Sequence, residues 1–116
     1  MKRGDVILAD FPFFDRPGKK RRPAVVIQAD SYNAKLATTM VAMISGQLKY
    51  AADPSQCIVD PATSEGASSG LNGPSVVKCN NVLTILQADV VRTIGALSTK
   101  LMRQVDQCLK TVLELP

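Results

Sequence analysis

The chain has 116 residues, with 14 Lys and Arg, 10 Asp and Glu and no histidine, and its formal net charge is +4. We expect one domain over residues 1–116, which at this length buries roughly 65% of the surface of its unfolded chain. The lack of histidine excludes Ser-His-Asp catalysis and histidine-based ribonuclease chemistry, because no side chain has an ordinary pKa near neutrality. The positive charge favours an acidic partner. The aromatic content of only 4% argues against a nucleic-acid reader that works chiefly by stacking bases.

The three cysteines, Cys57, Cys79 and Cys108, are widely separated and form no Cys-x-x-Cys pair. This spacing supports neither a disulfide framework nor a zinc site. No apolar run approaches the roughly 20 residues that span a bilayer, and residues 1–5 are charged without the apolar stretch of a signal peptide behind them. We therefore expect a cytoplasmic protein that binds no metal, no other cofactor and no membrane.

Apolar runs that end at turn residues predict short β-strands in the first half of the chain. We expect strands at residues 5–9, 23–28 and 37–44, a loop that continues through Gly18, and a polar connection over residues 30–33. The last two strands contain uninterrupted apolar runs, residues 23–27 and 40–44, which is typical of strands buried on both sides.

A basic run, Lys19-Lys20-Arg21-Arg22, leads directly into the second of these strands. Four consecutive cations would repel one another in a core, so we expect them in a loop at the surface. Pro23 and the β-branched residues after it hold Arg22 at the edge of a strand, where its guanidinium suits a phosphate. The alternative is a solvated loop that only flanks the strand.

The second half of the chain predicts three more strands and a closing helix. We expect strands at residues 56–59, 75–85 and 93–97, a mobile loop rich in Ser, Gly and Ala over 61–74, and a helix over 99–115. Ser98 is a good N-cap for this helix. Cys108 belongs to the apolar stripe of the helix, which predicts a packing role.

Alternation along residues 75–85 predicts which side chains share a face. We expect Cys79 to face the core and Lys78 to face solvent or a ligand. The same alternation predicts that one face of the strand carries Val77, Cys79, Leu83 and Ile85, and that the other face carries Lys78 and Asn80. Because strands and helices do not alternate, the fold class is mainly β, as a small barrel or curled sheet with a C-terminal helix.

Three segments now make the chain resemble the MazF/PemK family of toxin-antitoxin endoribonuclease toxins. They are Lys2-Arg3-Gly4-Asp5-Val6, Arg22-Pro23-Ala24-Val25-Val26-Ile27 and Val41-Ala42-Met43-Ile44-Ser45, in the family's order and spacing. The likeness continues through Gly70-Leu71, Ser75-Val76-Val77, Thr84-Ile85 and Ile94-Gly95-Ala96-Leu97-Ser98.

The resemblance implies an SH3-like small barrel of the CcdB/PemK type with a C-terminal α-helix, and a homodimer. It also implies metal-independent, sequence-selective cleavage of single-stranded messenger RNA, and a cognate antitoxin that covers the RNA groove. DNA would be bound only through the antitoxin complex. In active members the Arg of the Arg-Pro pair and a Thr or Ser at the end of the third strand form the site, which gives Arg22 and Ser45 as catalytic residues. Some members also use an Arg and an Asp where this chain has Lys78 and Asn80.

The chemistry of these side chains suggests a role for each. Arg22 donates to two phosphate oxygens at once, and its pKa above about 12 excludes it as a general base, so we expect it to stabilise the transition state. Ser45 donates a hydrogen bond to a phosphate oxygen, orients the 2′-hydroxyl, or only caps a turn. The expected RNA-binding residues are Lys19, Lys20, Arg21 and Lys78 for phosphates and Gln47 and Asn80 for base edges, with solvent exposure as the alternative for the last three.

A different class of function remains open. The same barrel also suits a non-catalytic binding module, either one that inhibits a protein target, as gyrase-inhibiting toxins of similar architecture do, or one that binds RNA without cutting it. Arg22 together with Ser45 favours the enzyme. The missing histidine and the missing Asp at Asn80 leave the proton-transfer steps without an evident residue.

Overall fold

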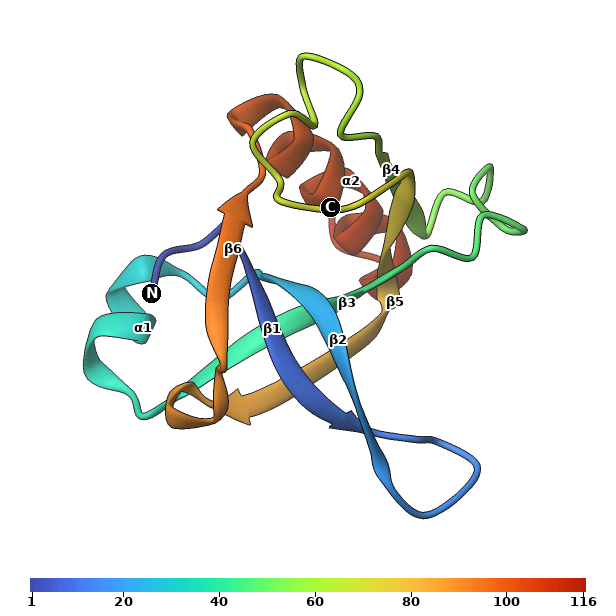
Figure 1. Ribbon diagram of the computed structural model, residues 1–116. Helices are drawn as coiled ribbons and strands as arrows, with labels where there is room; N and C mark the ends of the chain where they lie inside the picture. The colour runs from blue at the N-terminus through green and yellow to red at the C-terminus, as the bar shows by residue number, and fades with distance from the viewer.

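The computed structural model describes all 116 residues and contains one curled antiparallel sheet and two helices (Figure 1). The six strands lie in the order β4-β5-β3-β2-β1-β6. Their bounds are Asp5–Pro12 for β1, Lys19–Val26 for β2, Thr38–Ser45 for β3, Gln56–Val59 for β4, Ser75–Leu86 for β5 and Arg92–Ala96 for β6. The helices are α1, Asp30–Lys35, and α2, Thr99–Leu113, and a short 3₁₀ turn, η1, covers Gln87–Asp89. The expected mainly β fold with a C-terminal helix is confirmed.

The sheet carries a buried core on each of its faces. The α2 core packs the sheet against α2 and includes Val6, Val25, Ala42, Ile44, Val77, Cys79 and Val105. The second core lies on the other face and consists of Ile7, Ala9, Phe11, Ala24, Val26, Val41 and Met43. Successive residues at 24–26 of β2 and 41–44 of β3 therefore alternate between two apolar interiors, which explains why these two stretches contain only apolar residues.

Helix α2 lies against β4 and β5, and the β1–β2 hairpin projects on the opposite side of the molecule (Figure 1). The helix begins as expected, because the Ser98 Oγ accepts a hydrogen bond from the Leu101 N–H at 3.1 Å. It ends at Leu113, two residues before the expected end, where Glu114 adopts the left-handed conformation with φ of 54°. Neither helix has the length and hydropathy that would carry it across a membrane.

A bulge in β5 corrects the expected alternation. The β3–β5 register changes from Ala42 opposite Val82 to Met43 opposite Lys78, so three residues of β5, 79–81, are inserted between consecutive pairs. An odd insertion reverses the face of every later side chain. Cys79, the first residue of the insertion, still faces the α2 core as expected. Leu83 and Ile85, which were expected beside it, pack against the second core instead.

Two further expectations differ from the structure. The polar connection expected at residues 30–33 is the start of α1. Asn33 is buried there, and its Oδ1 accepts hydrogen bonds from Gln28 Nε2 at 2.9 Å and from Thr39 Oγ1 at 2.7 Å. The basic run lies in β2 and not in a loop. Its residues extend the antiparallel pairing with β1 as far as Lys19 opposite Pro12.

Candidate functional site

Arg22 lies in β2 opposite Ala9 and lines a cleft of about 390 Å³. The other walls of this cleft, which we call the hairpin cleft, are residues 11–16 together with Met43, Asn81 and Leu83. The Arg22 Cζ lies 5.8 Å from the centroid of the Phe13 ring, and no acidic side chain forms an ion pair with Arg22. Its guanidinium, partly buried and without an anionic partner, is therefore available to an anion that enters the cleft.

Ser45 ends β3, the strand next to β2. The pairing of the two strands runs from Val26 opposite Val41 to Ala24 opposite Met43 and ends two residues before Arg22 and Ser45. Ser45 does not line the hairpin cleft. The Ser45 Oγ accepts a hydrogen bond from the Gln47 N–H at 3.1 Å, so the turn-capping role expected as the alternative is present. The hydroxyl proton remains free to be donated, because a serine hydroxyl accepts and donates at the same time.

The four cations of the basic run are divided between the two faces of β2. Lys20, opposite Phe11, and Arg22 share the face of the second core, since side chains of a paired strand alternate. Lys19 and Arg21 point the other way. Arg21 Nε lies 3.1 Å from Asp10 Oδ1, and this hydrogen bond to Asp10 raises the pKa of Arg21. The structure therefore groups Lys20 with Arg22 and separates both from Lys19 and Arg21.

The remaining expected RNA-binding residues lie at different distances from Arg22 along the sheet. Lys78 is opposite Met43 and so shares the face of Arg22, two strands away. Gln47 is exposed in the turn after Ser45, and Asn80 is exposed in the β5 bulge without lining the hairpin cleft. Asn81, the next residue, does line it.

Sequence analysis missed several residues of the hairpin cleft. Phe13, Phe14 and Arg16 belong to the loop between β1 and β2, and Asn81 belongs to the bulge. The pair Phe13-Phe14 next to the basic run is a signal that could have been used, since exposed aromatic residues near cations are typical of single-stranded nucleic-acid sites.

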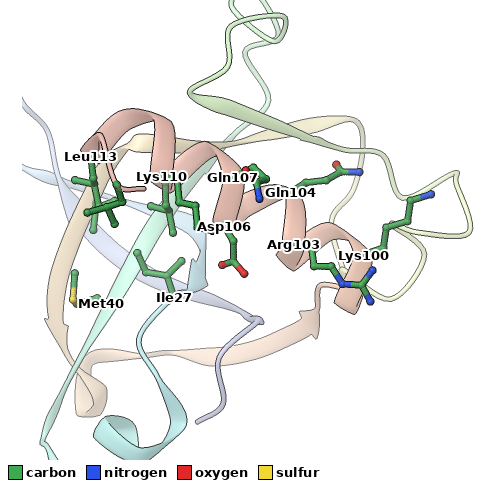
Figure 2. Close-up of a pocket in the computed structure, with 12 residues that line it drawn as sticks. Ile27, Met40, Lys100, Arg103, Gln104, Asp106, Gln107, Lys110 and Leu113 are labelled. Atoms are coloured by element: carbon green, nitrogen blue, oxygen red, sulfur yellow. The ribbon is translucent and has the colours of Figure 1, made fainter.

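The larger cleft of the molecule lies elsewhere, along α2, and has a volume of about 700 Å³ (Figure 2). Figure 2 shows Lys100 and Arg103 at one end and Leu113, Met40 and Ile27 at the other. Its carboxylate, Asp106 Oδ1, is held at 2.6 Å by Arg3 Nη2. None of the expected site residues lines this cleft, so its size does not mark the reactive site.

The side chains present limit the chemistry of the hairpin cleft. No group of three or more His, Cys, Asp or Glu side chains is arranged as a metal site. The three cysteines are buried in the α2 core, where burial raises the pKa of Cys57 to about 11 and that of Cys79 to about 12, so both stay protonated and are poor nucleophiles at neutral pH. In the cleft, Arg22 supplies positive charge and hydrogen-bond donors.

Comparison with known proteins agrees with this fold. Residues 2–113 match the family model described as PemK-like, MazF-like toxin of type II toxin-antitoxin system. Endoribonuclease MazF6 of Mycobacterium tuberculosis is 36% identical over 118 residues, which cover 99% of this chain and 98% of that protein.

Two solved structures are similar over almost the whole chain. The Mycobacterium tuberculosis toxin MazF-mt6 superposes with a TM-score of 0.78 at 26% identity, covering 97% of this chain and 98% of that one. An endoribonuclease in complex with its cognate antitoxin from a mycobacterial species has a TM-score of 0.80 at 18% identity and shares the fold, covering 100% of this chain and 97% of that one. The chain therefore belongs to the PemK-like, MazF-like family of type II toxins.

Proposed function

We propose that the protein is the endoribonuclease toxin of a type II toxin-antitoxin pair and cuts single-stranded messenger RNA without a metal ion. The observation that carries this proposal is the placement of Arg22, which lines the hairpin cleft without an acidic partner, on the strand next to the one that Ser45 ends. The names of the similar proteins, which are endoribonucleases, support it.

The reaction is the attack of a ribose 2′-oxygen on the adjacent phosphorus. A bond forms between the 2′-oxygen and phosphorus while the bond to the leaving 5′-oxygen breaks, which gives a 2′,3′-cyclic phosphate and a 5′-hydroxyl. Negative charge grows on the non-bridging oxygens, and the fork of Arg22 donates to two of them. Ser45 donates a hydrogen bond to a non-bridging oxygen of the same phosphate, or orients the 2′-hydroxyl in line with the leaving 5′-oxygen.

Proton transfer needs a separate assignment, because neither Arg22 nor Ser45 is a base at neutral pH. The only carboxylate that lines the cleft is Asp15, whose Oδ1 lies 3.6 Å from Arg16 Nη1 and whose side chain is 76% exposed. We assign both proton transfers to solvent water. Catalysis then rests on orientation and on charge stabilisation, which suits a moderate rate.

Two protein partners belong to this proposal, and they occupy different surfaces. The cognate antitoxin covers the hairpin cleft, because inhibition requires that RNA be kept from Arg22, and DNA is bound only through that complex. A second copy of the chain packs on the cleft along α2. The second copy would cover the apolar lining of this cleft, which otherwise stays in solvent. The apolar residues of the lining are Ile27, Met40, Val82, Leu109, Leu113 and Leu115. The toxin acts in the cytoplasm, where messenger RNA is found.

The test is cleavage of a single-stranded RNA by purified protein in the presence of a chelator. We expect cleavage by the wild type and a loss of at least about 100-fold in Arg22→Ala, as is typical when a preorganised donor to a developing oxyanion is removed. Arg21→Ala is the matched control. It removes the neighbouring cation of the same strand, which points to the other face and is paired with Asp10, and we expect a change of less than about 5-fold.

The outcomes separate the two classes of function. Undiminished cleavage by Arg22→Ala would contradict the site. Tight binding of RNA in low salt without cleavage by the wild type would replace the enzyme with a non-catalytic RNA-binding module, and absence of both would favour a module that inhibits a protein target.

A further inference from the structure

The phenylalanines of this chain are concentrated at one place. The sequence contains three, Phe11, Phe13 and Phe14, and all three line the hairpin cleft together with Arg22. The low overall aromatic content therefore does not describe this site, where aromatic rings make up a large share of the wall.

The three rings differ in exposure in a way that suggests different tasks. Phe11 is 3% exposed and belongs to the second core, so it forms the floor of the cleft. Phe14 is 87% exposed and is the most exposed large apolar side chain of the protein. A ring left mostly in water adds little to the core, and because Phe14 also lines the cleft, its exposure favours a role in binding.

Phe13, which lies between Phe11 and Phe14 in the sequence, holds the β1–β2 loop in place. The Arg16 Cζ lies 4.1 Å and the Arg22 Cζ 5.8 Å from the centroid of its ring, both within the range of cation–π attraction. The Phe13 N–H also donates to the Gly18 carbonyl oxygen at 3.2 Å, and Gly18 has the φ of +104° that closes the loop. Phe14 is therefore carried by a loop that is tied to the side chain of Arg22.

The opposite wall offers one polar group for recognition. Asn81 lines the cleft from the β5 bulge, and its side-chain amide forms no hydrogen bond within the protein. An amide both donates and accepts, which is the pattern that the edge of a nucleobase requires. The cleft of about 390 Å³ also falls within the size range of small-molecule sites.

We propose that the hairpin cleft is the base-binding pocket for a nucleotide next to the cleaved phosphate, with its base stacked on Phe14 and its edge read by Asn81. This inference rests on the proposed function, because Arg22 connects the two: it lines the pocket and binds the phosphate of the same nucleotide. Stacking supplies affinity for any base, whereas Asn81 supplies the preference among bases.

The experiment combines a protein variant with a substrate variant. After a cleavage site has been mapped on a long single-stranded RNA, a short oligonucleotide that spans it is compared with two versions that carry an abasic residue on either side of the cleaved bond. We expect Phe14→Leu to lower kcat/KM about 10-fold or more on the complete oligonucleotide, the size of effect seen when a stacking ring is removed. On one of the abasic versions, Phe14→Leu and wild type should be equal, because the base that Phe14 would contact is missing.

The control is Tyr32→Leu, which removes a half-exposed ring from α1, a helix that contributes no residue to the cleft. It should leave kcat/KM on every substrate unchanged. A second variant, Asn81→Ala, should reduce the difference in kcat/KM among the four bases at the position whose base stacks on Phe14. The inference is overturned if wild type cleaves while Phe14→Leu behaves like Tyr32→Leu, or if the loss in Phe14→Leu is the same with and without each base.

Failure of the proposed function is distinguishable from failure of the pocket. If the wild type cuts no RNA, no cleavage site can be mapped. Equilibrium binding in low salt is then measured on a short single-stranded oligonucleotide and on a series of versions that each carry one abasic residue, placed at successive positions. In that case a Kd that is about 10-fold weaker in Phe14→Leu, and that becomes equal to wild type when one base is removed, supports the pocket without the enzyme. Equal Kd values on all of them would reject it.

Discussion

The α2 core and the hairpin cleft lie at opposite ends of the same strand, β2, and they differ in what that strand does. Val25 is fully buried in the α2 core, whereas Arg22, three residues earlier, is partly exposed in the cleft. Both halves of β2 pair with β1 over the whole range from Lys19 to Val25. The buried apolar half of β2, residues 24–26, thus fixes the position of the basic half, residues 19–22. Arg22 is therefore held by a paired strand and not by a free loop.

This comparison indicates a division between stability and binding. Side chains of the α2 core are buried and apolar, and they pack the sheet against α2, so none of them is available to bind a ligand from solvent. Side chains of the hairpin cleft include an unpaired guanidinium, a free amide and an exposed ring. Substitutions in the two regions should therefore change different measurements.

The largest effect on stability is expected in the α2 core. Val105 of α2 is 0% exposed, and Val105→Ala should lower the free energy of unfolding by about 2 kcal/mol, because it removes buried methyl groups and leaves a cavity. The cleavage rate per folded molecule should not change. Urea unfolding followed by circular dichroism measures the first quantity, and the cleavage assay at a temperature well below the transition measures the second.

Thr111→Ala is the control on the same helix. Thr111 is exposed, and its hydroxyl donates only to the Gln107 carbonyl of its own helix at 3.0 Å. We expect a change in unfolding free energy within about 0.5 kcal/mol. If Val105→Ala reduced catalysis of the folded protein as strongly as it reduced stability, the two regions would not be separate.

A smaller effect should distinguish the two faces of the basic run. Lys20 shares the face of Arg22, while Lys19 lies on the other face opposite Pro12. We expect Lys20→Ala to weaken RNA binding about 3- to 5-fold at moderate salt. It should also reduce the slope of log Kd against log salt by about 0.7, the value for one lost phosphate contact on a single strand. Lys19→Ala should change neither. Equal effects of the two variants would mean that the run acts as an undirected positive patch.

Much of the fold followed from the sequence because its signals were local. The turn residues around the apolar runs, the cap at Ser98 and the helical spacing of Leu101, Val105 and Cys108 each act within a few residues. The same holds for the apolar stretches of β2 and β3. These predictions were confirmed, apart from shifts at the ends of elements.

The parts that sequence could not provide depend on pairing between distant segments. The division of the basic run between two faces follows from the register with β1, and the reversal within β5 follows from three residues that have no partner in β3. The cleft itself is closed by Asn81 and Met43, which are far from Phe14 along the chain. Periodicity within one strand carries no information on these distances.

The smallest expected effect concerns pH and the thiols of the α2 core. Burial raises the pKa of Cys57 to about 11 and that of Cys79 to about 12, and it also raises the pKa of Cys108. In the unfolded chain these thiols ionise near pH 8.5, so above that pH the unfolded state loses protons that the folded state keeps. The free energy of unfolding should therefore be at its full value below about pH 8.5 and should fall as pH rises toward 11.

Two core variants separate the thiols from other groups that titrate at high pH. Cys79→Ala and Val77→Ala both remove buried atoms from β5 in the α2 core, so both should lower stability at pH 7. Only Cys79→Ala removes an ionisable group, so its unfolding free energy should fall less between pH 8 and 10 than that of wild type or Val77→Ala. Urea unfolding at a series of pH values measures this. Equal losses in the two variants would exclude Cys79 from the response of stability to pH.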